Sequence, residues 1–170
     1  GAVVEVLRAR EKEEKAPRDV WLACAVLKKD TFEWVAQKAT ELGVSHIVPF
    51  VADNSVKHNL RRPRLEKIVR EAAEQSERAT LPELREVTDL ECVLSLGPQS
   101  VALMERAFGA PQLESYKEDP LMLVVGPEGG WSDEETALLK KQDVSVEYLG
   151  PQILRSETAA IAACSRVLLT

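Results

Sequence analysis

The sequence predicts an α/β fold, with a mainly parallel sheet flanked by helices. Continuously apolar runs of strand length, such as 20–27 and 121–125, alternate along the chain with segments that have helical periodicity or helix caps. Strands without apolar–polar alternation are typical of parallel sheets buried on both faces. The 170 residues amount to one domain, which we expect to span 20–170, with 1–19 as a charged connector or edge segment.

The first strand, 20–27, is expected to lead into a helix over 30–42. Asp30 is a favourable N-cap, and Glu33 stands three residues later in the capping-box position. Gly43 follows the last periodic residue and supplies a C-terminal stop. This part of the chain is therefore predicted to be a strand–helix unit.

A second strand is predicted over 46–51, where Pro49 indicates a sheet edge or a strand end. The polar and basic residues 53–62 are typical of a loop. The clearest helix follows over 63–79, and Pro63 is acceptable at its first position. Its apolar residues have the i, i+3, i+4 spacing of one buried stripe: Leu65, Ile68, Val69, Ala72 and Ala73.

The middle of the chain carries weaker signals. A short strand is expected after Pro82, then a helix over 88–96 and a strand over 101–104. Residues 109–120 contain one glycine and two prolines, which predict a loop before the strand at 121–125.

The C-terminal part is expected to hold further strands and helices in alternation. Ser132 and Glu135 have capping-box spacing, which predicts a helix from 132 to about 141. A strand over 144–149 and a final helix over 156–168 follow. The final helix is rich in alanine, which permits close packing against neighbouring elements.

Net charge and cysteine count narrow the class of protein. The formal net charge is −6, which argues against a domain that holds nucleic acid by bulk electrostatics. A basic stretch at 57–64 is either a local patch for RNA or a solvated loop. Three cysteines without zinc spacing predict no metal site, and buried thiols in a reducing compartment. No membrane partner is expected, because no apolar run reaches the length of a membrane span.

Two glycine-containing turns near the C-terminus point to a ligand. The first, 124–132, reads Val-Val-Gly-Pro-Glu-Gly-Gly-Trp-Ser, and the second, 148–159, reads Tyr-Leu-Gly-Pro-Gln-Ile-Leu-Arg-Ser-Glu-Thr-Ala. Each turn follows a predicted strand and leads into a predicted helix. Because ligands of open α/β sheets bind at the carboxyl ends of the strands, we expect the two turns to form two sides of one pocket.

The composition of the turns favours a cationic ligand over a phosphate. Gly126, Gly129 and Gly130 can adopt positive φ and let a ligand approach the main chain. Glu128 disfavours a phosphate, but suits a cation or ribose hydroxyls. The glycine-rich patterns of the common nucleotide-binding loops, GxxxxGK[ST] and GxGxxG, do not occur in the sequence. The second turn adds apolar groups for a flat ring and two charged side chains: Leu149, Ile153, Leu154, Arg155 and Glu157.

Four segments together resemble the RsmE-type ribosomal RNA (uracil-N3) methyltransferases of the SPOUT superfamily: 37–44, 71–78, 125–130 and 149–159. The resemblance implies a C-terminal trefoil knot, which is an exception to the general absence of knots. It implies S-adenosylmethionine (SAM) as cofactor, and a homodimer with the active site near the subunit interface. It also implies a cytoplasmic enzyme, organellar if from a eukaryote, and an N-terminal PUA-like RNA-binding domain that is absent from this chain.

Carried over position by position, the resemblance implies SAM contacts from the end of a middle strand and from both turns: Leu103, Gly126, Pro127, Glu128, Gly129, Leu149, Gly150, Ile153, Leu154, Arg155, Thr158 and Ala159. The implied reaction methylates N3 of a uridine in 16S rRNA of the small ribosomal subunit. Because N3 carries a proton, this reaction needs a base or a group that stabilises the uracil anion. Arg155 is the candidate for anion stabilisation, Glu157 for proton acceptance, and Arg78 for holding RNA, within one subunit or across the dimer.

Three alternatives stay open from the sequence. A SPOUT enzyme with another RNA target would share these motifs. A knotted fold kept as a non-catalytic binding or dimerisation module would lack a working SAM pocket. A generic α/β nucleotide-binding protein fits the order of elements, but the missing phosphate-binding loops count against it.

Overall fold

The computed structural model describes residues 18–55, 60–105, 110–114 and 116–169. Their seven strands form one sheet in the order β3-β2-β1-β6-β5-β7, with β4 also paired to β2, and all of these pairs are parallel. The elements in chain order are β1 (Val20–Ala25), α1 (Lys29–Leu42), β2 (His46–Val51), α2 (Arg62–Gln75), β3 (Glu83–Leu84), β4 (Thr88–Asp89), α3 (Leu90–Leu94), β5 (Gln99–Leu103), β6 (Leu121–Val125), α4 (Asp133–Lys141), β7 (Ser145–Glu147) and α5 (Ser156–Leu168).

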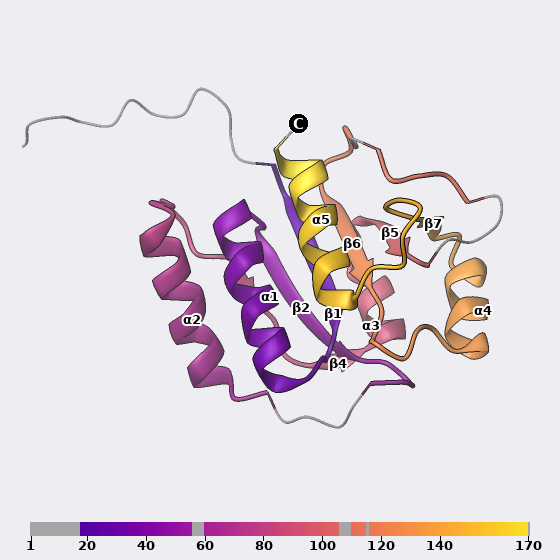
Figure 1. Cartoon of the computed structure of the whole chain (residues 1–170), viewed down its shortest axis with the longest axis horizontal. Helices are drawn as coiled ribbons and strands as arrows, with labels where there is room; N and C mark the ends of the chain where they lie inside the picture. The colour runs from indigo at the N-terminus through magenta and orange to yellow at the C-terminus, as the bar shows by residue number, and fades with distance from the viewer. Residues whose placement is uncertain (1–17, 56–59, 106–109, 115, 170) are drawn as a thin grey trace, which may run out of the picture.

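Helices cover both faces of the sheet (Figure 1). α1, α2 and α5 pack on one face, where Phe32 and Cys164 are buried in the same cluster as Leu22 of β1. α3 and α4 belong to a second cluster, in which Leu139 packs with Ala23. Neighbouring residues of β1 therefore enter opposite cores. This confirms that its unbroken apolar run marks a strand buried on both faces of a parallel sheet.

The capping box at the start of α4 is confirmed. The Ser132 hydroxyl accepts a hydrogen bond from the Glu135 N–H at 3.0 Å, and the Glu135 carboxylate accepts one from the Ser132 N–H at 2.9 Å. The final helix also has its predicted bounds, Ser156–Leu168. α4 follows the first glycine-containing turn and α5 begins within the second, so both turns lie where the sequence predicted them.

The predicted capping box of α1 is wrong. The helix begins at Lys29 after an N-cap at Lys28, and Asp30 lies inside its first turn. The Glu33 carboxylate instead accepts a hydrogen bond from Arg64 Nε at 2.7 Å. Since Arg64 is 31 residues away, this long-range ion pair removes the carboxylate from the local cap. The predicted stop at Gly43 is confirmed, with φ +109°.

α2 ends four residues before the predicted position 79. Glu77 adopts a left-handed φ of 55°, and the Arg78 N–H bonds the Ala73 carbonyl at 2.9 Å. The Glu77 N–H bonds the Glu74 carbonyl at 3.2 Å. This is a Schellman ending with glutamate where glycine is usual, so no residue type at this position signals the end of the helix.

Pro49 lies in an inner strand, contrary to the predicted edge. It pairs with Cys24 of β1 on one side. On the other side, β2 pairs with β3 at 46–47 and with β4 at 50–51. Pro49 lies in the gap between those two short strands, where its missing N–H costs no ladder hydrogen bond.

The helix predicted over 88–96 is split. Thr88–Asp89 form β4, and the Asp89 side chain caps the short helix α3 by accepting from the Cys92 N–H at 2.7 Å. Cys92 is exposed, so the expectation of buried thiols holds only for Cys24 and Cys164. The connector before residue 18 and positions 57–59 of the basic stretch lie outside the described residues.

Candidate cofactor pocket

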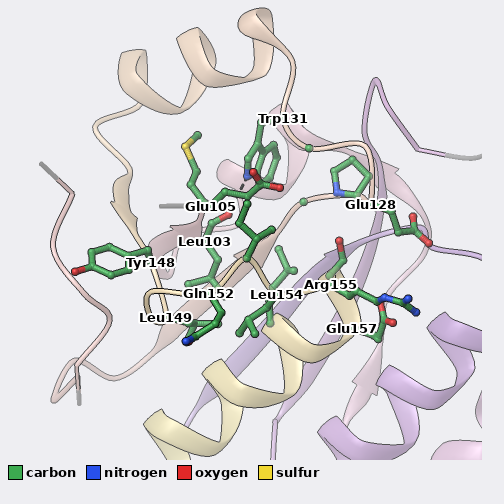
Figure 2. Close-up of a pocket in the computed structure, with 18 of the residues that line it drawn as sticks. Leu103, Glu105, Glu128, Trp131, Tyr148, Leu149, Gln152, Leu154, Arg155 and Glu157 are labelled. Carbon is green, nitrogen blue, oxygen red and sulfur yellow. Dashed lines mark hydrogen bonds between the residues drawn. The ribbon is translucent and has the colours of Figure 1, made fainter. Parts of the chain in front are cut away.

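A cavity of about 540 Å³ lies where β1, β5 and β6 end, and both glycine-containing turns line it. Its volume is in the range of small-molecule sites. Figure 2 shows side chains from the two turns and from the end of β5 around one space. The prediction that the turns form two sides of one pocket is therefore confirmed.

In the first turn, the main chain is shaped by Trp131. The indole N–H donates to the Leu103 carbonyl at 2.9 Å, which ties the turn after β6 to the end of β5. A Cβ added to Gly126 would lie 2.8 Å from Cε2 of this indole. Gly126 is therefore required by the close approach of a protein side chain.

The predicted role of positive φ is wrong for two of the three glycines. Gly130 alone among them has a left-handed φ, +75°. A Cβ on Gly129 would lie 2.9 Å from the Cβ of Asn54, and Gly129 does not line the cavity. The small size of this glycine makes room for the loop after β2.

The second turn forms the opposite wall and leads into α5. Its carbonyl at Leu149 accepts from Gln112 Nε2 at 3.1 Å and from Arg166 Nη1 at 3.1 Å. Leu149 and Leu154 are partly buried at the cavity, whereas Ile153 is 70 % exposed at its mouth. Within the described residues, no side chain caps the α5 N-terminus. Its first N–H groups are therefore available to a ligand in the cavity.

Charged side chains surround the end of β1 at one side of the cavity. Arg155 and Glu157 extend together towards the side on which Glu128 lies (Figure 2). The Lys28 N–H donates to the Glu128 carboxylate at 3.4 Å. Burial raises the pKa of the Cys24 thiol far above its usual range, and the charges of Cys164, Glu128 and Glu157 add to this effect. The carboxylates of Glu128 and Glu157 therefore both influence the Cys24 thiol near the end of β1.

Most of the predicted cofactor residues line the cavity. These are Leu103, Gly126, Pro127, Glu128, Leu149, Gly150, Ile153, Leu154, Arg155 and Ala159, together with Glu157. Gly129 and Thr158 do not line it. Gly129 faces Asn54, and Thr158 is an exposed residue in the first turn of α5.

Arg78 lies away from the cavity. It donates from Nη1 to the Thr40 carbonyl at 2.8 Å, and burial lowers the pKa of its guanidinium. Thr40 is near the C-terminal end of α1, whereas Thr31 in the first turns of the same helix lines the cavity. The rise of a helix separates these two positions by about 14 Å. Within one chain, Arg78 thus holds two helix ends together.

The sequence did not single out nine other lining residues. Four lie outside the two predicted turns, Lys28, Thr31, Met104 and Glu105, and five lie within them, Val125, Trp131, Tyr148, Gln152 and Ser156. Gly130, expected to let a ligand approach the main chain, also lines the cavity. One signal would have found some of the nine. Lys28 and Glu105 shortly follow the predicted strands of β1 and β5, and the carboxyl ends of parallel strands meet at one edge of the sheet.

Comparison with known proteins identifies the family. Residues 14–168 match the family described as the RNA methyltransferase domain. The chain belongs to this family. It is 35 % identical to the ribosomal RNA small subunit methyltransferase E of Bacillus subtilis, over 95 % of this chain and 70 % of that protein. It is 31 % identical to the protein of the same name from Synechocystis, over 96 % of this chain and 57 % of the relative.

Solved structures agree with the sequence relatives. The ribosomal RNA small subunit methyltransferase E of Neisseria gonorrhoeae, bound to S-adenosyl methionine, matches with a TM-score of 0.80 and 28 % identity, over 88 % of this chain and 65 % of that one. A Legionella pneumophila protein in complex with SAM matches with a TM-score of 0.79 and 31 % identity, over 88 % and 65 % of the two chains. The resemblance to RsmE-type enzymes, first seen in four motifs, is confirmed.

The described residues form neither a metal-binding cluster nor a membrane-spanning helix. Among the described residues, no group of three or more histidine, cysteine, aspartate or glutamate side chains is arranged to hold a metal ion. None of the helices described is long and apolar enough to cross a membrane.

Proposed function

We propose that this chain is the SAM-binding, methyl-transferring domain of an enzyme that methylates N3 of a uridine in 16S rRNA. One observation carries the proposal: the two family motifs that are farthest towards the C-terminus line a single cavity at the carboxyl ends of the strands. Relatives in sequence are named for methylation of small-subunit rRNA, and the two matching structures described above hold SAM.

The residues around the cavity fit SAM chemically. Leu103, Leu149 and Leu154 offer apolar surface to an adenine ring. The carboxylates of Glu128 and Glu157 favour a cation at one side of the cavity. The uncapped N–H groups at the start of α5 favour a carboxylate. Bound SAM supplies a methyl group carried on a cationic sulfonium.

The chain's own part in the reaction is to handle the N3 proton of uracil. Glu157, which lines the cavity and is partly buried, is the proposed proton acceptor. Arg155 lies beside it and is proposed to stabilise the negative charge that uracil gains as the proton leaves (Figure 2). A general base contributes about 10²–10⁴-fold to such a rate. Glu157→Gln is therefore expected to lower kcat by about that factor.

The proposal for Arg155 has a direct test. We expect Arg155→Ala to lower kcat by about 10²–10³-fold, as for the loss of one preorganised group that stabilises an anion. The readout is methyl transfer from labelled SAM to small ribosomal subunits, at saturating SAM. An Arg155→Ala protein that binds SAM normally and keeps full turnover would refute this role.

The path of the chain around the second turn supports the proposed trefoil knot. Residues 111–113 bond both sides of Tyr148: its N–H donates to the Pro111 carbonyl at 3.2 Å, and its carbonyl accepts from the Leu113 N–H at 2.8 Å. Arg166 of α5 donates to the carbonyls of Leu113 and Leu149. The second turn is thus held against the β5–β6 connection, as passage of the C-terminal segment through that connection requires.

The proposed homodimer is supported by exposed apolar side chains. Trp34 of α1 is 44 % exposed, and Ile153 at the mouth of the cavity is 70 % exposed. Isolated apolar residues are ordinary on a surface, but Trp34 is only one helical turn beyond Thr31, which lines the same cavity as Ile153. A role of Arg78 in holding RNA requires this second subunit, because Arg78 is far from the cavity of its own chain.

RNA binding by this chain alone is expected to be weak. Its net charge is −6, and the described part of the basic stretch is largely paired. Arg62 bonds Glu66 and Glu86, and Arg64 bonds Glu33. The relatives extend beyond the matched region, and we propose that such additional surface, of the PUA-like kind, supplies RNA affinity. We propose that the enzyme acts in the cytoplasm, with the ribosomes that it modifies.

Calorimetry of the full chain with SAM tests the first step of this function. A dissociation constant in the micromolar range is expected, and no measurable binding would favour the non-catalytic module. Mass spectrometry of rRNA from cells that lack the gene then tests the target. Loss of one N3-methyluridine from 16S rRNA is expected, and loss of a methyl group from a tRNA or from 23S rRNA would show another RNA target.

A further inference from the structure

A short loop after β2 braces the first turn from outside the cavity. Asn54 donates from Nδ2 to the Gly130 carbonyl at 3.0 Å and to the Gly129 carbonyl at 3.4 Å. The contact is close, because a Cβ on Gly129 would lie 2.9 Å from the Asn54 Cβ. Asn54 and the glycines that it contacts are about 75 residues apart in the sequence.

A second set of hydrogen bonds fixes the same loop to the start of α4. The Asp53 N–H donates to the Glu135 carboxylate at 3.1 Å, and the Asp53 carboxylate accepts from the Ser132 hydroxyl at 2.6 Å. Glu135 is only 6 % exposed and also closes the capping box of α4. The loop is therefore held to a rigid helix end, which makes it a firm support for the turn beside it.

The brace determines which way the peptide groups of the turn face. Both carbonyls that Asn54 holds point towards the loop. The peptide bond after Gly130 is trans, so the N–H of the next residue, Trp131, points to the opposite side. Gly130 and Trp131 line the cavity, whereas Asn54 does not. The left-handed φ of Gly130, +75°, permits this arrangement.

We propose that Asn54 is a positioning residue for SAM binding. It acts through the first turn by holding the carbonyls of Gly129 and Gly130 away from the cavity, so that the turn presents the main-chain N–H of Trp131 and Glu128 to the cofactor; the Gly130 N–H is used within the turn, where it donates to the Pro127 carbonyl at 3.0 Å. This inference rests on the proposed function, because it takes SAM as the ligand of the cavity. On this view the loop after β2 is part of the cofactor site although it contributes no lining residue.

The test measures SAM affinity by calorimetry and turnover on small ribosomal subunits, with the full chain. Asn54→Ala removes one amide group that serves two carbonyls, and we expect SAM affinity to fall about fivefold to tenfold. Asn54→Asp is expected to weaken binding further, because its carboxylate oxygens would face two carbonyl oxygens. In both variants KM for SAM should rise while kcat changes little, since Asn54 touches no reacting group.

Asp89→Ala is the matched control. It removes another exposed side-chain hydrogen bond, the 2.7 Å cap of α3, from the adjoining part of the same sheet edge. It should lower the melting temperature without changing SAM affinity. If Asp89→Ala weakens SAM binding as much as Asn54→Ala, general loss of stability explains both and the proposal is overturned.

A double-variant cycle covers the case in which one variant folds poorly. Gly129→Ala places a methyl group against Asn54. The fold-loss of SAM affinity that it causes should therefore be at least about threefold smaller in an Asn54→Gly background. Independent effects at the two positions would overturn the proposal. If the unaltered chain does not bind SAM, the proposed function itself fails. If it binds SAM and Asn54→Ala binds equally well, only the positioning role fails.

Discussion

Replacing Gly126 with alanine probes the geometry of the first turn most directly. The added Cβ would lie 2.8 Å from Cε2, 3.0 Å from Nε1 and 3.1 Å from Cδ2 of Trp131. These atoms belong to a rigid ring that cannot swing aside, because its N–H donates to the Leu103 carbonyl at 2.9 Å and its plane stacks near Phe50 at 6.1 Å between centroids. Either the indole or the turn must move.

The expected cost follows from overpacking of a buried contact. Inserting one methyl group into such a site destabilises by about 1–3 kcal/mol. For a domain of this size, about 2 kcal/mol lowers the melting temperature by about 4–8 °C. SAM affinity should fall as well, because Gly126 and Trp131 both line the cavity.

Gly150→Ala is the matched control for stability. Gly150 also lines the cavity, but a Cβ there would meet nothing within 4 Å, and its φ lies outside the left-handed region. Thermal and urea unfolding of both variants give the comparison. Trp131→Leu in the Gly126→Ala background should recover part of the lost stability, because it removes the ring that the methyl group meets. Equal stability of Gly126→Ala and Gly150→Ala would refute the reasoning.

Three further predictions concern the framework around the site. Ser132→Ala removes the hydroxyl of the α4 capping box and is expected to cost about 1–2 kcal/mol in urea unfolding. Arg78→Ala leaves the Thr40 carbonyl without its charged donor; we expect a loss of about 1.5–3 kcal/mol with unchanged SAM affinity by calorimetry, whereas a change in affinity would give Arg78 a cofactor role. Burial, and then the charge of Glu114, raises the pKa of Glu147 in the folded protein. As pH rises, the Glu147 carboxyl therefore ionises at a lower pH in the unfolded chain than in the folded protein. The free energy of unfolding should fall as pH rises from the ordinary carboxyl range through the raised pKa. Glu147→Gln should flatten this pH dependence in urea unfolding measured between about pH 4 and 8.

The sheet and the pocket were predictable because their signals are local. Apolar runs such as 121–125 need no knowledge of the rest of the chain to be identified as buried strands. The capping box at Ser132 consists of residues three positions apart, and it forms as predicted. Once the strands were placed, the position of both turns at one edge of a parallel sheet followed from topology alone.

The incorrect predictions share a physical cause, which is competition from distant residues. Glu33 has the right spacing for a cap, but Arg64 from another helix takes its carboxylate. Pro49 would mark an edge in isolation, but two short strands leave a gap at its side. Asn54 carries no motif and was not predicted to matter, since its partners are on a turn far along the chain.

The glycines of the first turn illustrate why a glycine-rich motif and a ligand contact are different things. A Cβ on Gly126 would clash with Trp131, and a Cβ on Gly129 would clash with Asn54. Gly130 alone has a backbone conformation that favours glycine. The groups left to face the cavity are the Glu128 carboxylate and the main-chain N–H of Trp131, since the Gly130 N–H donates to the Pro127 carbonyl. Substitutions at Trp131 or Asn54 should therefore change SAM affinity by changing the shape of the main chain. Two glycines of the run Gly-Pro-Glu-Gly-Gly are thus required by the close packing of protein side chains around the turn, and this packing shapes the pocket.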